Sequence, residues 1–241
     1  MSGPCEFESL ESRKLLSLTI PHVEWSLTSR GTLVISGSGL TSDAIHVTRA
    51  KGDKIRFVAR TEGGMEVGSR FSASRVKRVL VDAGYGNDRV AIDPTLGKRV
   101  TVLAGAGNDH VHANPGATVI GGGGNDRLQI HPPVQVFAFM PVGETPRIEV
   151  FDEPGLLSGG AGNDTLVAGA NDTVVGGVGD DRAVLHLVDL SVSADRITDK
   201  PQFARDAWDE RATGIETFDV LDQRPIDEIG VPGITPVVPA R

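Results

Sequence analysis

The most constraining feature of this sequence is a short phrase that recurs through its middle. In its fullest form the phrase reads Gly-Gly-x-Gly-x-Asp-x-U-x, where U is apolar. Full and partial copies begin at Gly84, Gly105, Gly121, Gly159, Gly169 and Gly176. Self-similarity at a short, nearly fixed period predicts stacked units, because a single unit of this length cannot bury its apolar face alone.

Each copy reads as a glycine turn followed by a strand. Glycines at alternating positions permit positive φ and a close approach of the backbone to a ligand or to another chain segment. After the turn, the runs Asp88–Ile92, Asp126–Ile130 and Asp164–Ala168 alternate polar and aliphatic residues, which predicts strands with one buried face. The residues predicted to point inward, two positions after each Asp, are Val90, Val111, Leu128, Leu166, Val174 and Ala183.

The spacing of the aspartates predicts the architecture. Two nonapeptides, about 18 residues, supply two strands and two turns, and successive aspartates are separated by 21, 17, 38 and 17 residues. We therefore expect an all-β fold, a right-handed parallel β-solenoid of the β-roll or β-helix type. One edge of it would carry Asp88, Asp109, Asp126, Asp164 and Asp181, and Asp172 would lie on the opposite edge.

The distribution of charge points to a cation. The whole chain has a net charge of −8, and residues 82–184 hold 6 Lys/Arg against 13 Asp/Glu together with 19 of the 30 glycines. Calcium accepts six to eight oxygen ligands, either carboxylate or carbonyl. Acid and glycine in one block therefore indicate a hard cation held by turns.

The tandem phrase resembles the RTX, or hemolysin-type, calcium-binding repeat. The resemblance covers 159–184 most closely and is looser over 83–130. It implies that Ca²⁺ is bound between successive turns on one edge: between 84–88 and 105–109, between 105–109 and 121–126, and between 159–164 and 176–181. The residues it implicates in metal binding are Gly84, Gly86, Asn87, Asp88, Gly105, Gly107, Asn108, Asp109, Gly122, Gly124, Asn125, Asp126, Gly160, Gly162, Asn163, Asp164, Asp172, Gly177, Gly179, Asp180 and Asp181.

The flanks of the repeat differ in composition. We expect residues 1–24 to be a tail, since 7–17 resemble the LEPR-xLL tag of exported bacterial surface proteins. Residues 25–190 would form the solenoid, with its densest repeats at 82–184, and 191–241 a closing segment with a Pro-rich end. Within the solenoid, 131–158 interrupts the repeat as an irregular coil or a loop, and the 38-residue spacing favours a coil. The stretch Gly37–Ile45 reads as a decayed copy.

Composition excludes several classes of protein. No stretch approaches the roughly 20 apolar residues of a membrane-spanning helix, and the net negative charge argues against nucleic-acid binding. The single cysteine, Cys5, rules out an intramolecular disulfide framework. His110 and His112 alternate along a strand, but a zinc site needs two more ligands, so we expect both at the surface.

The sequence therefore favours an exported, non-enzymatic calcium-binding module of structural or adhesive function, located outside the cell or at its surface and in contact with a surface or extracellular polymer. The alternative is an enzyme of the polysaccharide lyase or epimerase type, which parallel β-helices also support. Its candidate outward groups are Arg89, Arg127 and Arg182, which read more simply as solvated partners of the acidic edge. A subunit of a polymerising surface layer is a third possibility.

Overall fold

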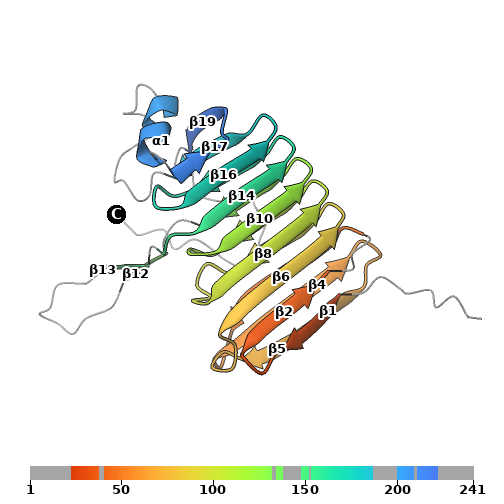
Figure 1. Ribbon diagram of the computed structural model, residues 1–241. Coiled ribbons are helices and arrows are strands. Elements are labelled where there is room, and N and C mark those ends of the chain that lie inside the picture. Colours follow the sequence, from red (N-terminus) through yellow and green to blue (C-terminus); the bar gives the residue numbers. More distant parts are fainter. Residues whose placement is uncertain are drawn as a thin grey trace, which may run out of the picture.

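The fold is built almost entirely of strands (Figure 1). The computed structural model describes residues 23–37, 41–131, 134–137, 148–151, 153–186, 200–208 and 211–221. Within these ranges the one α-helix is α1, Lys200–Trp208, and no helix is long and apolar enough to cross a membrane. The predicted all-β class is confirmed. The proposed LEPR-xLL-like tag and the Pro-rich end lie outside the described residues.

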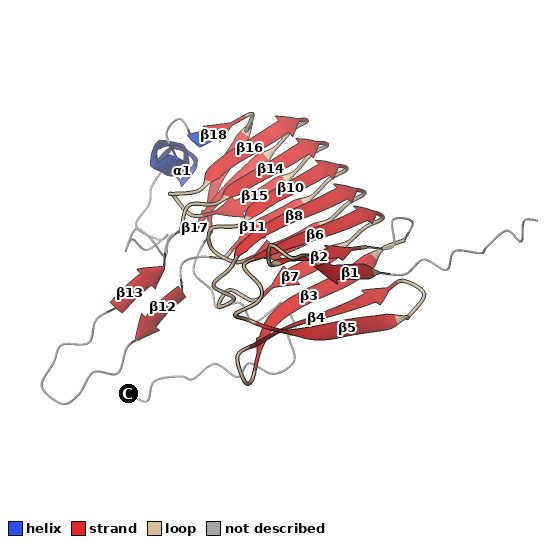
Figure 2. Cartoon of the chain, turned by 60° about the horizontal axis from the view of Figure 1, so that its bottom comes forward, coloured by secondary structure: helices blue, strands red, loops and turns tan. Residues whose placement is uncertain are grey.

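Two large sheets face one another across the core (Figure 2). The first is eight-stranded, with strand order β1-β2-β6-β8-β10-β14-β16-β18. Its members are β1 Glu24–Leu27, β2 Thr32–Ser36, β6 Arg78–Tyr85, β8 Arg99–Ala106, β10 Thr118–Gly123, β14 Leu156–Ala161, β16 Thr173–Val178 and β18 Ala212–Thr213. All neighbours pair in parallel except β1 and β2, which are antiparallel.

The second sheet is nine-stranded, with strand order β19-β17-β15-β11-β9-β7-β3-β4-β5. Its members are β3 Asp43–Ala50, β4 Lys54–Thr61, β5 Glu66–Ser72, β7 Arg89–Ile92, β9 His110–Ala113, β11 Arg127–Ile130, β15 Thr165–Ala168, β17 Arg182–His186 and β19 Thr217–Leu221. In this spatial order, neighbouring strands from β19 as far as β3 pair in parallel. At the other end of the sheet, β3, β4 and β5 form an antiparallel meander.

From β6 onward, apart from β12 and β13, the chain alternates between the two sheets, so each sheet gains one strand per repeat unit. Turns that lead from the eight-stranded to the nine-stranded sheet form what we term the aspartate edge: residues 86–88, 107–109, 124–126, 162–164 and 179–181. Turns in the return direction form the second edge, which includes 93–98, 114–117 and 169–172. Asp172 therefore lies opposite the other five aspartates, as the spacing predicted.

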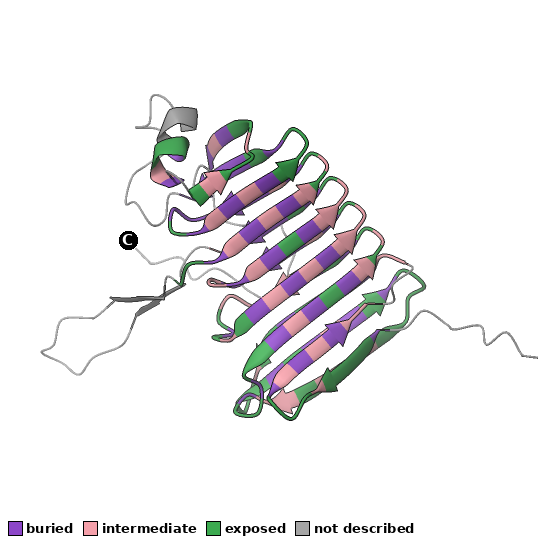
Figure 3. Cartoon of the chain, viewed as in Figure 1, coloured by how far each residue is buried: buried purple, intermediate pink, exposed green. Residues whose placement is uncertain are grey.

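The core is narrow and aliphatic because each strand presents alternate residues to the interior (Figure 3). In the eight-stranded sheet the row Val81, Val102, Val119, Leu157 and Val174 is in register and fully buried. All six residues predicted to point inward two positions after an Asp are buried: Val174 belongs to this row, and the other five face it from the nine-stranded sheet. The two-residue period of the strands and the repeat length together place these side chains in one continuous stack.

The interruption at 131–158 is an excursion rather than a coil, so the expectation drawn from the spacing is wrong. β10 pairs directly with β14 and β11 directly with β15, with no strand between them. The excursion contributes β12 Val134–Phe137 and β13 Ile148–Phe151, an antiparallel pair that forms a separate sheet. The 38 residues are thus one ordinary unit plus an insertion whose length mimics a second unit.

The C-terminal end of the core is covered by α1 and β19. The helix begins at Lys200 and ends at Trp208. Trp208 is fully buried, and its indole N–H donates to the carbonyl oxygen of Gly169 at 2.8 Å. This anchor places the end of the helix over the last units, and β19 closes the nine-stranded sheet as predicted.

Candidate metal centre

The turns of the aspartate edge share one backbone conformation. Each turn begins with a glycine at positive φ, and a second such glycine lies two residues earlier in the preceding strand, with φ between +100° and +143°: Gly84 and Gly86, Gly105 and Gly107, Gly122 and Gly124, Gly160 and Gly162, Gly177 and Gly179. A Cβ at Gly124 would collide with the carbonyl oxygen of Gly107, and the same relation repeats between neighbouring turns. The turns therefore stack at a separation that side chains at these positions would not allow.

A ladder of hydrogen bonds links the aspartates of successive turns. The Oδ1 atom of Asp109 accepts from the backbone N–H of Asp88 at 2.7 Å, and Asp126 Oδ1 accepts from Asp109 N–H at 2.8 Å. The same bond joins Asp126 N–H to Asp164 and Asp164 N–H to Asp181, each at 2.8 Å. Each carboxylate thus fixes the turn before it, across the 131–158 insertion as well.

A second ladder runs through the residue before each aspartate. The amide oxygen of Asn87 accepts from the backbone N–H of Asn108, and that of Asn108 from Asn125, both at 2.7 Å. Asn125 and Asn163 continue the series to Asp180 N–H at 3.0 Å. The Asn-Asp pair of the phrase is therefore more than a turn former, because the Asp side chain binds the preceding turn and the Asn side chain binds the following one.

The second oxygen of each aspartate is buried without a hydrogen-bond partner. This holds for Oδ2 of Asp88, Asp109, Asp126, Asp164 and Asp181, whose residues are at most 3% exposed. Burial raises the pKa of Asp88 and of Asp126 to about 7, and neighbouring carboxylates add to the rise. Burial also raises the pKa of the other three carboxyls. An orphaned carboxylate oxygen in each of five stacked turns is a costly arrangement unless a cation or a proton neutralises it.

These turns suit a hard cation. In the three full copies the first glycine leaves room for the carboxylate: a Cβ at Gly121 would collide with Asp126 Oδ2 and come within 2.6 Å of the Gly159 carbonyl oxygen. Among the described residues no three His, Cys, Asp or Glu side chains gather closely enough to hold a metal. A site here must therefore combine aspartate oxygens from adjacent turns with backbone carbonyls, a donor set of oxygens that calcium accepts.

Residues beyond the predicted set extend the ladder at both ends. At the N-terminal end, Asp43 N–H donates to Asp88 Oδ1 at 2.7 Å, and Asn87 N–H donates to Ser42 Oγ at 3.0 Å. At the C-terminal end, Asp181 N–H donates to Glu216 Oε2 at 2.7 Å. The decayed copy at Gly37–Ile45 was the available signal for Asp43. Nothing comparable marked Glu216, since its turn contains a single glycine, Gly214.

Asp172 differs from the five aspartates of the ladder. It is buried on the second edge, where Oδ1 accepts from Gly155 N–H at 2.7 Å and Oδ2 from Gly169 N–H at 2.9 Å. Both of its carboxylate oxygens thus cap backbone amides. The geometry gives Asp172 a role in holding the turn 169–172 against the segment that precedes β14.

The histidines lie closer together than the sequence indicated. His110 and His112 have their Nε2 atoms 2.8 Å apart, and the ring of His131 lies 5.7 Å from that of His112, centroid to centroid. The expectation that both alternating histidines lie at the surface is wrong for His112, which is only 8% exposed. Burial lowers the pKa of His112 to about 3 and that of His186, on the same sheet, to about 4, so both are neutral at neutral pH.

Comparison with known proteins agrees with this geometry. The family model described as RTX calcium-binding nonapeptide repeat matches four copies, over residues 101–128 and 156–183. These ranges contain the turns of Asp109, Asp126, Asp164, Asp172 and Asp181, while the turn of Asp88 lies outside them. The comparisons with curated proteins and with solved structures each found no match.

Proposed function

Because the chain carries RTX nonapeptide repeats, which bind Ca²⁺, we propose that it is an exported, non-enzymatic β-solenoid whose folding is locked by calcium. The cations would lie between consecutive turns of the aspartate edge. The single observation that carries the proposal is the row of buried, partnerless Oδ2 atoms along that edge.

The ions would occupy the gaps between successive turns. Three gaps were expected from the sequence, and the direct stacking of the Asp126 turn on the Asp164 turn favours a fourth. The ligands would be the aspartate of each turn together with backbone oxygens of its glycines. Turns at 84–88, 105–109, 121–126, 159–164 and 176–181 would thus be cross-linked in pairs. The parallel alternation of the two sheets supports a right-handed solenoid over 25–190, flanked by the tail 1–24 and the closing segment 191–241.

Binding and folding would be one equilibrium. A site with a dissociation constant of about 10⁻⁴ M contributes about 1.4 kcal/mol when calcium is about tenfold higher. Four sites would add about 6 kcal/mol, comparable with the whole stability of an ordinary domain. Without calcium the same carboxylates repel one another at short range. The chain would therefore be loosely structured inside a cell and folded outside it, where it would serve a structural or adhesive role.

A calcium titration of the purified chain, followed by far-UV circular dichroism and limited proteolysis, tests this function. We expect β-structure and protease resistance to rise at sub-millimolar to millimolar calcium, and not with magnesium, which binds such flexible all-protein sites poorly. Full β-structure and unchanged protease resistance in chelator would refute the calcium lock.

The alternative function, a lyase or epimerase acting on acidic polysaccharide, makes a different prediction. Such an enzyme would convert uronate oligomers, releasing unsaturated ends or changing their stereochemistry. Incubation of the calcium-folded chain with uronate oligomers, followed by absorbance and NMR, distinguishes the two. Turnover would favour the enzyme, and its absence in folded protein would favour the structural role.

A further inference from the structure

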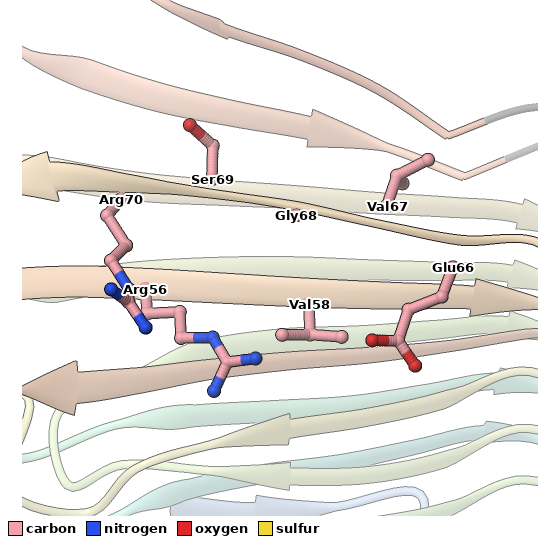
Figure 4. Close-up of a pocket in the computed structure, with 7 residues that line it drawn as sticks. All are labelled: Arg56, Val58, Glu66, Val67, Gly68, Ser69 and Arg70. Carbon is pink, nitrogen blue, oxygen red and sulfur yellow. The ribbon is translucent and has the colours of Figure 1, made fainter.

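The outer face of the β3–β4–β5 meander carries an arginine pair that has no acidic partner among the described residues. Arg56 on β4 and Arg70 on β5 are directly opposite in register, and both are exposed. They project to the same side of the sheet in Figure 4. In the described part of the chain no ion pair involves either residue. Like charges directly opposite on a sheet destabilise it, so a bound anion would remove a cost that the isolated chain bears.

The neighbouring cross-strand pair shows the contrast. Arg60 lies opposite Glu66, and its Nη2 atom is 2.7 Å from Glu66 Oε2. The carboxylate closest to the arginine pair along β5 is therefore already engaged. Edge protection would account for the charge on β5, the terminal strand of its sheet, but β4 is paired on both sides. Protection of an edge thus leaves the charge of Arg56 unexplained.

A hollow lies beside the arginine pair. It has a volume of about 260 Å³ and is lined by Arg56, Val58, Glu66, Val67, Gly68, Ser69 and Arg70. The hollow is deepest at Gly68, which lies opposite Val58 and has no side chain to fill the space. A Cβ at Gly68 would come within 2.6 Å of the Phe57 carbonyl oxygen. Two planar guanidinium groups at one end offer the fork geometry that carboxylate and sulfate groups accept.

Further exposed arginines follow on the same face of the nine-stranded sheet. Arg89 on β7 and Arg127 on β11 flank His110 in register. Both are exposed, and no salt bridge in the described residues ties either to the aspartate edge, contrary to the expectation from the sequence. Asp93, on the same face, caps the backbone amides of Arg49 and Thr95. With strands about 4.8 Å apart, this row of arginines spans about 24 Å across the sheet from β11 to β5, with the Arg56–Arg70 pair displaced by four residues along its strands from the register line of Arg89 and Arg127.

We propose that this face binds an anionic polysaccharide through its carboxylate or sulfate groups, with Arg56 and Arg70 as the anchoring pair. The length of the row favours a polymer over a single ion. A single-stranded nucleic acid fits less well, because the exposed aromatics of the described residues, Trp25 and Tyr85, on which bases could stack, lie on the other sheet. The inference rests on the proposed function, since the calcium-folded chain presents the face.

The test measures binding of the full chain, in excess calcium, to dextran sulfate and to short uronate oligomers by biolayer interferometry. Neutral dextran is the blank. The double variant Arg56→Gln/Arg70→Gln is compared with Arg78→Gln/Arg99→Gln, a directly opposed arginine pair on the other sheet whose hollow includes Glu153. Both variants remove two charges. We expect the first to weaken binding about tenfold or more and the second by less than about threefold.

Each other result overturns the inference. Equal losses in both variants would indicate net charge rather than a site, and binding of a single-stranded oligonucleotide as tight as that of the polysaccharides would assign the face to another polymer. No binding by wild-type protein that folds with calcium would refute the polysaccharide site alone. Failure of the same preparation to respond to calcium in circular dichroism would refute the proposed function instead, so the two failures are separable.

Discussion

Replacing the aspartate at the centre of the ladder should change stability in opposite directions with and without calcium. Asp109→Asn keeps an oxygen to accept from Asp88 N–H but removes the charge that faces Asp88 and Asp126. Two unit charges one strand spacing apart, about 4.8 Å, repel by about 3.5 kcal/mol at an effective dielectric of about 20. Two such neighbours give an upper bound of about 7 kcal/mol.

That bound must be reduced before it is compared with experiment. The pKa of Asp88 and Asp126 is about 7, so at neutral pH each neighbour carries about half a charge, and because burial also raises the pKa of Asp109 the relief is at most about 3.5 kcal/mol. The new amide is buried without a partner, which costs about 2 kcal/mol. In chelator, Asp109→Asn should therefore be stabilised by at most about 1–2 kcal/mol.

In calcium the sign reverses. The variant lacks a ligand in the gaps on both sides of its turn, which removes about 3 kcal/mol of binding energy, and the buried amide still costs about 2 kcal/mol. We expect a net loss of about 5 kcal/mol relative to wild type. Urea unfolding followed by circular dichroism, in chelator and in millimolar calcium, measures both values.

Asp172→Asn is the matched control, because Asp172 is an equally buried aspartate whose two oxygens both cap backbone amides. Its variant should lose the same stability in either condition. The reasoning fails if Asp109→Asn is destabilised equally in chelator and in calcium. A cost of Asp172→Asn that grows with calcium would show that Asp172 also binds the ion.

Three further predictions follow from the fold. Gly122→Ala should lower the free energy of unfolding by more than about 2 kcal/mol, because Gly122 has φ +119° and lies against the Gly105 carbonyl oxygen. Gly123→Ala is the control and should change the urea midpoint little, because a Cβ there meets nothing within 4 Å. Equal midpoints for the two variants would contradict the stacking. Trp208→Phe should lose about 1 kcal/mol or more with its bond to the Gly169 carbonyl, and an unchanged thermal midpoint would argue against the helix as a cap. His112 has a pKa of about 3 in the folded chain. Below about pH 6.5 the histidine therefore binds a proton in the unfolded chain but stays neutral in the folded chain. Wild type should therefore lose stability relative to His112→Gln between about pH 7.5 and about pH 5, and a constant difference would refute this.

Much of the repeat could be predicted because its information is local. The glycine positions dictate positive φ, and the residue two positions after each Asp dictates the inward face, so six inward residues and the two edges follow from the phrase alone. The strands Asp126–Ile130 and Asp164–Ala168 were likewise recognisable from alternation, to within one residue.

Predictions were wrong where the separation of residues along the sequence did not indicate their distance in the folded chain. The distance of 38 residues from Asp126 to Asp164 suggested an additional coil, yet their turns are adjacent, since an insertion can leave a stack without changing its register. His112 was expected at the surface, but it is buried beside His110 and His131, a neighbourhood that no pair of residues in one strand could indicate.

The sequence by itself determined the turns, the strand faces and the kind of cation, because backbone conformation and ligand chemistry depend on residues within one nonapeptide. Only the tertiary structure decided that each carboxylate shares one oxygen with the preceding turn and keeps the other buried, that Asp43 and Glu216 end the ladder, and that Arg56 faces Arg70. The physical reason is that these contacts join residues 14 to 45 positions apart, and the register of stacked strands, which no single repeat contains, sets which of them meet.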